Sequence, residues 1–224
     1  MSNWRRVRLA IEIMLIYIIA PVLVYFLVYV RHVPLLALLP FVLAILIVLL
    51  FLEPDRSWLS AFHRLPHLSD LASILGLFIV CGGALTYYAS YSVPQYFLVF
   101  PERAPDLWRK VMFFYPLISV TTQEILYRVF YFHRYAPLFG KFEWGAILFN
   151  AFLFAFMHAT LFAYRHSPFH WEAVAISFAG GLIFAYRFSR TRSFWAVGLE
   201  HALYGDLLFT VGLGIYFFTG VANL

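Results

Sequence analysis

Seven apolar runs, separated by short polar connections, constrain the fold of this chain more than any other feature of its sequence. A membrane-spanning helix needs about 20 apolar residues, and only 12% of the residues are charged, about half the share in a soluble domain. We therefore predict an all-α polytopic membrane protein with about seven transmembrane helices, forming a single membrane domain of residues 1–224. The predicted spans are residues 9–30, 34–52, 71–91, 111–132, 144–164, 171–186 and 194–218.

Proline and glycine residues predict where these helices bend or approach one another. Pro21 lies inside the first run and predicts a kink there. The glycine pairs at 82–83 and 180–181 predict close helix packing. Residues 92–108 contain three prolines and several aromatic residues, a composition that favours a segment at the membrane interface over a span.

The charges exclude one class of partner and favour one orientation. The net charge is +5 at pH 7, but the basic residues occur as pairs and triplets between apolar runs, so nucleic-acid binding is excluded. With the N-terminus inside, the inner connections hold ten Lys and Arg residues and the outer connections hold five. The positive-inside rule then favours this orientation. We predict a multi-pass protein of a prokaryotic inner membrane with its N-terminus in the cytoplasm.

Several polar and ionisable residues within the predicted spans require an explanation. A charged residue at the centre of a span costs about 2.5–3.5 kcal/mol on insertion scales, so each is a candidate for function. At about 1.5 Å per residue these groups lie at overlapping depths of roughly 12–22 Å, and we predict that they share one central intramembrane cavity. They are Glu124 and Arg128 in the fourth span, Asn150 and His158 in the fifth, which share one helix face with Phe154, and Glu200, His201 and Asp206 in the seventh.

Each of these groups also has a purely structural explanation. Glu124 and Arg128 are four residues apart and can neutralise each other as an ion pair. A single buried histidine commonly forms a hydrogen bond between helices, and Glu200 can do the same. A carboxylate and two histidines at similar depth are harder to explain by packing alone.

The combination of a carboxylate and two histidines suits the hydrolysis of a peptide bond. A carboxylate removed from water binds a proton readily, which suits a general base acting on water, and a nearby histidine can donate to a developing oxyanion. Zinc binding by the same groups would need the close His-x-x-x-His pairing that the sequence lacks. Because Cys81 is the single cysteine, we predict neither a metal site nor another cofactor.

Three short motifs occur in order on three of the predicted spans. Residues 123–128 read Gln-Glu-Ile-Leu-Tyr-Arg, residues 154–158 read Phe-Ala-Phe-Met-His, and His201 is followed by Asp206. They resemble the Glu-Glu-x-x-x-Arg, Phe-x-x-x-His and His-x-x-x-Asn/Asp motifs of the CAAX-protease and bacteriocin-processing family of intramembrane glutamic-type endopeptidases. The resemblance covers about residues 110–210 and implies hydrolysis of a peptide bond in a membrane-associated protein or peptide.

Two positions depart from the family pattern. Gln123 stands where the family has the glutamate to which the resemblance assigns water activation, and a glutamine cannot accept a proton. Gly205 stands four residues after His201, and Asp206 follows it, rotated by about 100° around the helix. Three explanations of Gln123 stay open: Glu124 is the base, the protein is a catalytically silent family member, or an engineered glutamine replaces a glutamate.

The resemblance also implies a role for each residue of the motifs. Glu124, or a glutamate at position 123, activates water, and His158 orients that water or the oxyanion. His201 and Asp206 complete the oxyanion site, with support from Arg128, Asn150 and Phe154. An ion pair with Arg128 makes Glu124 a weaker base, which opposes this mechanism.

Two other functions fit the same residues. The first is a silent adaptor that binds a membrane peptide in the cavity without cleaving it. The second is a transporter that uses the buried charges and histidines as a proton relay. Transporters commonly have internal repeats and paired broken helices, and the sequence contains neither.

Overall fold

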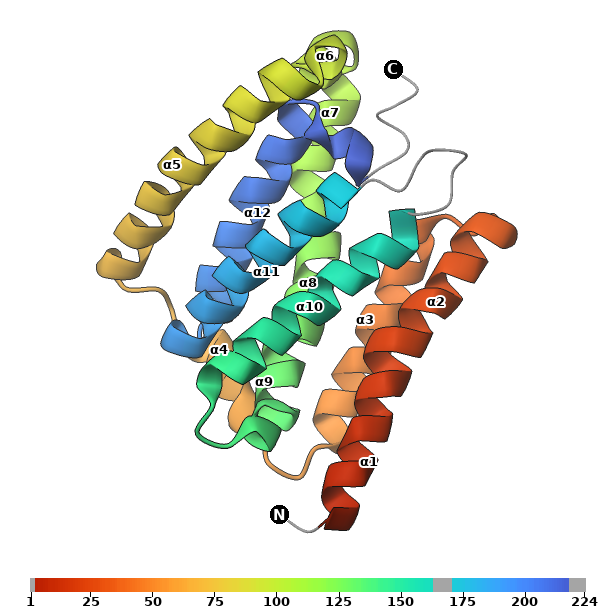
Figure 1. The fold of residues 1–224 in the computed structure, drawn as a ribbon, viewed down its shortest axis with the longest axis vertical. Helices are drawn as coiled ribbons and strands as arrows, with labels where there is room; N and C mark the ends of the chain where they lie inside the picture. The colour runs from red at the N-terminus through yellow and green to blue at the C-terminus, as the bar shows by residue number, and fades with distance from the viewer. Residues whose placement is uncertain (1–2, 163–170, 218–224) are drawn as a thin grey trace.

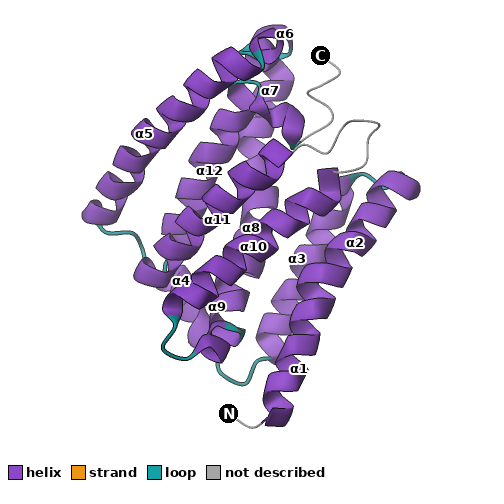
Figure 2. Ribbon diagram, in the orientation of Figure 1, coloured by secondary structure: helices purple, strands orange, loops and turns teal. Residues whose placement is uncertain are grey.

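Helices make up the regular structure of the described residues, and consecutive long helices run in opposite directions between the two ends of the molecule (Figure 1). The computed structural model describes residues 3–162 and 171–217, and no strand occurs in these two ranges (Figure 2). Seven long helical segments cross the described part of the molecule, with α5 at one side and α1 with α2 at the other (Figure 1). They are α1 (Asn3–Ile13) with α2 (Ala20–Tyr25), α3 (Leu35–Leu52), α5 (Leu68–Ser92), α7 (Pro105–Phe114) with α8 (Thr121–Glu124) and α9 (Tyr131–Arg134), α10 (Glu143–Phe162), α11 (Trp171–Thr191) and α12 (Phe194–Thr210). The short helices are α4 (Ser60–His63) and α6 (Val99–Arg103), with 3₁₀ turns at Ser57–Leu59, Pro94–Tyr96, Ala136–Phe139 and Leu213–Tyr216.

Each predicted span coincides with one of these long segments, but four boundaries differ by five residues or more. The first helix begins at Asn3, six residues before the predicted start of its span. The fourth helix begins at Pro105 because proline suits the first turn of a helix, so part of the predicted interfacial segment is helical. The sixth helix continues to Thr191. The seventh ends at Thr210, since Gly212 adopts a positive φ of 93°. The ends predicted at residues 164 and 218 lie outside the described residues.

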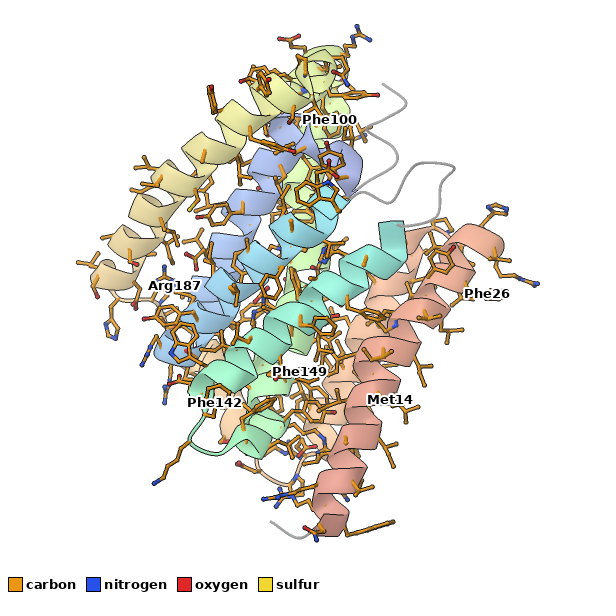
Figure 3. The ribbon with its side chains drawn as sticks, in the orientation of Figure 1. Met14, Phe26, Phe100, Phe142, Phe149 and Arg187 are labelled. Atoms are coloured by element: carbon orange, nitrogen blue, oxygen red, sulfur yellow. The ribbon has the colours of Figure 1, made fainter. Side chains whose placement is uncertain are left out.

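The apolar surface of the molecule supports a membrane location only in part. Among the described residues, two helices are long and apolar enough to cross a membrane, Asn3–Val28 and Leu68–Ser92. Shorter apolar helices occupy Ala37–Leu52 and Glu143–Ala159. Large apolar side chains are exposed on the outer helices, and Figure 3 shows two of them, Met14 and Phe26, projecting outward. The all-α prediction is confirmed, and the crossing of a membrane by all seven helices stays a prediction.

Two of the long segments contain π-helical turns, in which the backbone hydrogen bonds join residues five apart instead of four. In the first segment these turns are Met14–Ile19 and Phe26–Val30, and in the fourth they are Tyr115–Val120 and Ile125–Phe130. Proline lacks the N–H that the hydrogen-bond ladder of a helix needs. Pro116 lies within the first of the two π-helical turns of the fourth segment. Single π turns inside α-helices are frequent at functional sites. Here two of them flank the residues Thr121–Glu124.

Small residues allow the helices around these turns to approach closely. A Cβ at Gly181 of α11 would lie 3.1 Å from the Ala151 backbone of α10, and one at Gly82 would lie 3.1 Å from Leu207. The close approaches predicted from the two glycine pairs are therefore present. Tyr17, fully buried, donates a hydrogen bond to the Leu126 carbonyl and joins the first helix to the fourth.

Candidate active site

A cavity of about 1380 Å³ lies between the helices and reaches from the connection after the first helix to the centre of the bundle. Apolar side chains form most of its wall. No aspartate or glutamate occurs among the described residues that line it. The polar lining residues are His32, Tyr88, Lys110, Tyr115, Ser119, Gln123, His158, Ser177, His201 and Tyr204.

Gln123, in α8, faces this cavity. Its Nε2 donates a hydrogen bond of 2.8 Å to Ser119 Oγ, one turn earlier. Its Oε1 is buried and has no hydrogen-bond partner among the described residues. The position to which the resemblance assigns water activation thus presents an amide, which can bind water or a peptide but cannot take up a proton.

Glu124, the neighbouring carboxylate, is fully buried and is not part of the described cavity wall. Its Oε1 lies 2.7 Å from His201 Nδ1 of α12, and its Oε2 lies 3.4 Å from Arg128 Nε. His201 therefore stands between this carboxylate and the cavity. This geometry does not suit a direct attack by a water that Glu124 itself activates.

Arg128 is also fully buried, and its remaining contacts hold it in place. Its Nη1 donates a 2.7 Å hydrogen bond to Asn150 Oδ1, and Asn150 in turn donates to the Tyr127 carbonyl at 2.6 Å. The guanidinium lies over the rings of Phe154 and Phe184, at 5.1 and 5.7 Å from their centroids. A buried cation needs such partners because it has lost its water.

His158 lies on the cavity wall contributed by α10. Its Nδ1 is 2.8 Å from the Phe154 carbonyl, one turn earlier in the same helix. A carbonyl only accepts hydrogen bonds, so Nδ1 carries the proton and Nε2 is the acceptor. The Phe154 ring packs against both histidines, with centroids 4.7 Å from His158 and 5.7 Å from His201.

The tautomer of His201 follows from its neighbours. The ionised carboxylate of Glu124 only accepts, so Nδ1 of His201 carries a proton. Because Arg128 already balances the charge of Glu124, a neutral imidazole leaves this buried cluster without net charge, which burial favours. Nε2 then accepts from the Tyr115 hydroxyl at 3.2 Å. The ring of Phe184 stacks on the imidazole, with centroids 4.6 Å apart.

The two other acidic candidates, Glu200 and Asp206, lie apart from the cavity wall. Glu200 is fully buried and accepts two hydrogen bonds of 2.9 Å from Arg187, which fits the structural role considered for it. Asp206 is partly buried, and its Oδ1 has no hydrogen-bond partner among the described residues. The structure thus brings Gln123, His158 and His201 to one cavity and leaves Asp206 out of it.

Tyr115 contacts His201 from the cavity side, and it was not among the site residues predicted from the sequence. Its position directly before Pro116, and two turns before Gln123, was an available signal. With 15 tyrosines in the chain, however, nothing in the sequence separated this one from residues that only pack. No group of three His, Cys, Asp or Glu side chains within the described ranges is arranged to hold a metal ion.

One comparison with known proteins matches the part of the chain that contains these residues. Residues 105–205 match the model of a family described as "Rce1-like: Type II CAAX prenyl endopeptidase Rce1-like". The match begins at the first residue of α7 and ends at Gly205, within α12, so it includes Gln123, His158 and His201. No curated protein and no solved structure matches the chain.

Proposed function

The chain belongs, through residues 105–205, to the family of type II CAAX prenyl endopeptidases, and from this premise we propose that it hydrolyses a peptide bond of a membrane-associated protein or peptide bound in the cavity. The members of this family are membrane-embedded proteases, which fits the apolar cavity wall. A substrate enters between the helices and presents its carbonyl group to the polar residues at the cavity's inner end.

One observation carries the proposal: the 2.7 Å contact between Glu124 Oε1 and Nδ1 of His201, a residue of the cavity wall. A carboxylate that holds one nitrogen of an imidazole fixes the tautomer and makes the other nitrogen a better base. We therefore assign water activation to Nε2 of His201 and a positioning role to Glu124. This assignment replaces direct activation by Glu124 and removes the conflict with its ion pair.

The reaction then needs no other proton acceptor. Water loses a proton to His201 Nε2 while its oxygen forms a bond to the carbonyl carbon, and the carbonyl π electrons move to the oxygen. The tetrahedral intermediate collapses when the C–N bond breaks and the same proton passes to the leaving amine. Gln123 binds the peptide through its unused Oε1, and His158 orients the attacking water.

A second function is favoured by one observation, the lack of a carboxylate among the described lining residues. In that case the protein is a silent family member that binds a membrane peptide without cleaving it. The amide of Gln123 would then contribute to binding only.

The test uses the purified protein in lipid nanodiscs and a quenched fluorescent peptide that ends in a prenylated Cys-aliphatic-aliphatic-X sequence. We expect the wild type to cleave the peptide and His201→Gln to lower kcat by about 10²–10⁴-fold, the range of general base catalysis. A wild type that binds the peptide but does not cleave it supports the silent function. In that event Gln123→Glu, which restores a carboxylate to the cavity wall, is expected to gain cleavage.

We propose further that all seven long helices cross the membrane, with the N-terminus inside. The opposite directions of consecutive long helices (Figure 1) and the ten-to-five distribution of basic residues support this topology. A reporter inserted near Pro137 should be cytoplasmic, and one inserted near Leu98 should be outside. The reverse result would contradict the orientation.

A further inference from the structure

Tyr115 reaches His201 from the cavity side, opposite Glu124. Its hydroxyl lies 3.2 Å from Nε2 of His201, and it is part of the cavity wall. Its ring packs edge-on against Phe209 of α12, with centroids 5.1 Å apart, so that the hydroxyl is held at this point. The Glu124 carboxylate, the His201 imidazole and the Tyr115 hydroxyl therefore form one continuous line of contacts that ends in the cavity.

The approach of Tyr115 depends on the absence of a side chain at position 205. A Cβ at Gly205 would overlap both the ring and the hydroxyl of Tyr115. Gly198, two turns earlier in the same helix, has nothing within 4 Å of the corresponding position. The tyrosine thus fills the space that a side chain four residues after His201 would occupy.

We propose that Tyr115 is a catalytic residue whose hydroxyl donates a hydrogen bond to the carbonyl oxygen of the bound peptide as that oxygen becomes negative. The inference rests on the proposed peptidase function and assigns its oxyanion donor. A neutral His201 with a protonated Nδ1 offers only an acceptor at Nε2 until it has taken the proton of water. Another donor must therefore stabilise the oxyanion when it forms, and the Tyr115 O–H is the group already at that nitrogen.

Substrate binding changes the partner of this hydroxyl. In the resting protein the Tyr115 O–H satisfies Nε2 of His201. When the attacking water takes that place, the O–H turns to the carbonyl oxygen, within the same cavity. The hydroxyl keeps its proton throughout, because the proton of water travels through His201 to the leaving amine.

Tyr127 offers a matched control on the same helical segment. It is fully buried, it is not among the described lining residues, and its hydroxyl has no hydrogen-bond partner among the described residues. Removing either hydroxyl deletes one oxygen from a tyrosine of this segment. Only the loss at position 115 removes a contact with His201.

The experiment compares kcat and KM of the wild type, Tyr115→Phe and Tyr127→Phe on the prenylated fluorescent peptide in nanodiscs. Loss of one oxyanion donor lowers kcat by about 10²–10³-fold, and we expect this fall for Tyr115→Phe with KM changed by less than about threefold, since the interaction forms in the transition state. Tyr127→Phe should keep the kcat of the wild type. Thermal unfolding of each variant confirms that it is folded.

The outcomes separate this inference from the function on which it rests. A wild type that cleaves the peptide while Tyr115→Phe is equally active overturns the role of Tyr115 and leaves the peptidase function intact. A rise in KM with unchanged kcat also overturns it, because the hydroxyl would then contribute to substrate binding alone. A wild type without any cleavage overturns both.

Discussion

Two buried carboxylates on neighbouring helical segments, Glu124 and Glu200, have partners of different kinds. Both are fully buried. Glu200 places its two oxygens 2.9 Å from the Nε and Nη2 atoms of Arg187, whose side chain is 12% exposed. Each group in that pair satisfies the other, and the pair is separate from the cavity wall.

Glu124, in contrast, contacts a residue of the cavity wall. One oxygen holds His201 at 2.7 Å, and the other lies 3.4 Å from Arg128, a more distant and fully buried partner. His201 in turn presents its second nitrogen to the cavity. Burial and ion pairing therefore do not separate the two carboxylates, whereas a contact with a histidine of the cavity wall does.

The largest expected effect separates the two carboxylates directly. Glu124→Gln removes the counterion of a fully buried arginine, and breaking a buried pair costs about 3–5 kcal/mol. It also removes the group that positions His201, so kcat should fall by at least about 10²-fold. Glu200→Gln removes the charged partner of Arg187, which lies close to the surface. This variant should lower the free energy of unfolding by about 1–3 kcal/mol and leave kcat unchanged.

Thermal unfolding and peptide cleavage, measured on both variants, check this prediction. A variant Glu200→Gln that is stable but inactive would remove the distinction between the two sites. Assaying Glu124→Gln at a lower temperature, at which the variant is folded, separates a loss of catalysis from a loss of folding.

The second prediction concerns position 205. Gly205→Ala introduces a methyl group that overlaps Tyr115, and the rigid ring has to move away from His201. Overpacking of this kind costs about 1–3 kcal/mol, and the loss of the hydroxyl contact should lower kcat by about 10–10²-fold. Gly198→Ala is the control, since its methyl group meets nothing within 4 Å. Equal activity of the two variants would contradict the dependence of Tyr115 on Gly205.

Much of this architecture could be predicted from the sequence because it follows from local patterns. Apolar runs of span length predicted the seven long helices, and the spacing of Asn150, Phe154 and His158 predicted their common face. Residues at i, i+4 and i+8 lie on one side of a helix whatever it packs against. Family motifs then related Gln123, His158 and His201 to one another across three helices.

The rest depended on rotations of helices that no local pattern specifies. Adjacent residues in a helix point about 100° apart, so either Gln123 or Glu124 could face the cavity, and the π turns on both sides shift this register further. The same uncertainty applied to Asp206. Tyr115 was missed because its role arises from the space above Gly205, which is a property of two packed helices.

The smallest expected effect concerns Asp206, which the motif resemblance had placed in the site. Its side chain is not part of the described cavity wall, so we expect it to make no contact with the carbonyl oxygen of a peptide bound there. Asp206→Ala removes the carboxyl group without supplying the N–H donor that an asparagine would bring, and we expect kcat to stay within about threefold of the wild type, since removal of a true oxyanion donor costs about 10²–10³-fold. The variant is measured beside Tyr115→Phe on the same peptide. If the aspartate variant lost more activity than the tyrosine variant, the polar group that serves His201 would be the one at position 206, and the assignment of the oxyanion donor would have to move from the fourth helix to the seventh.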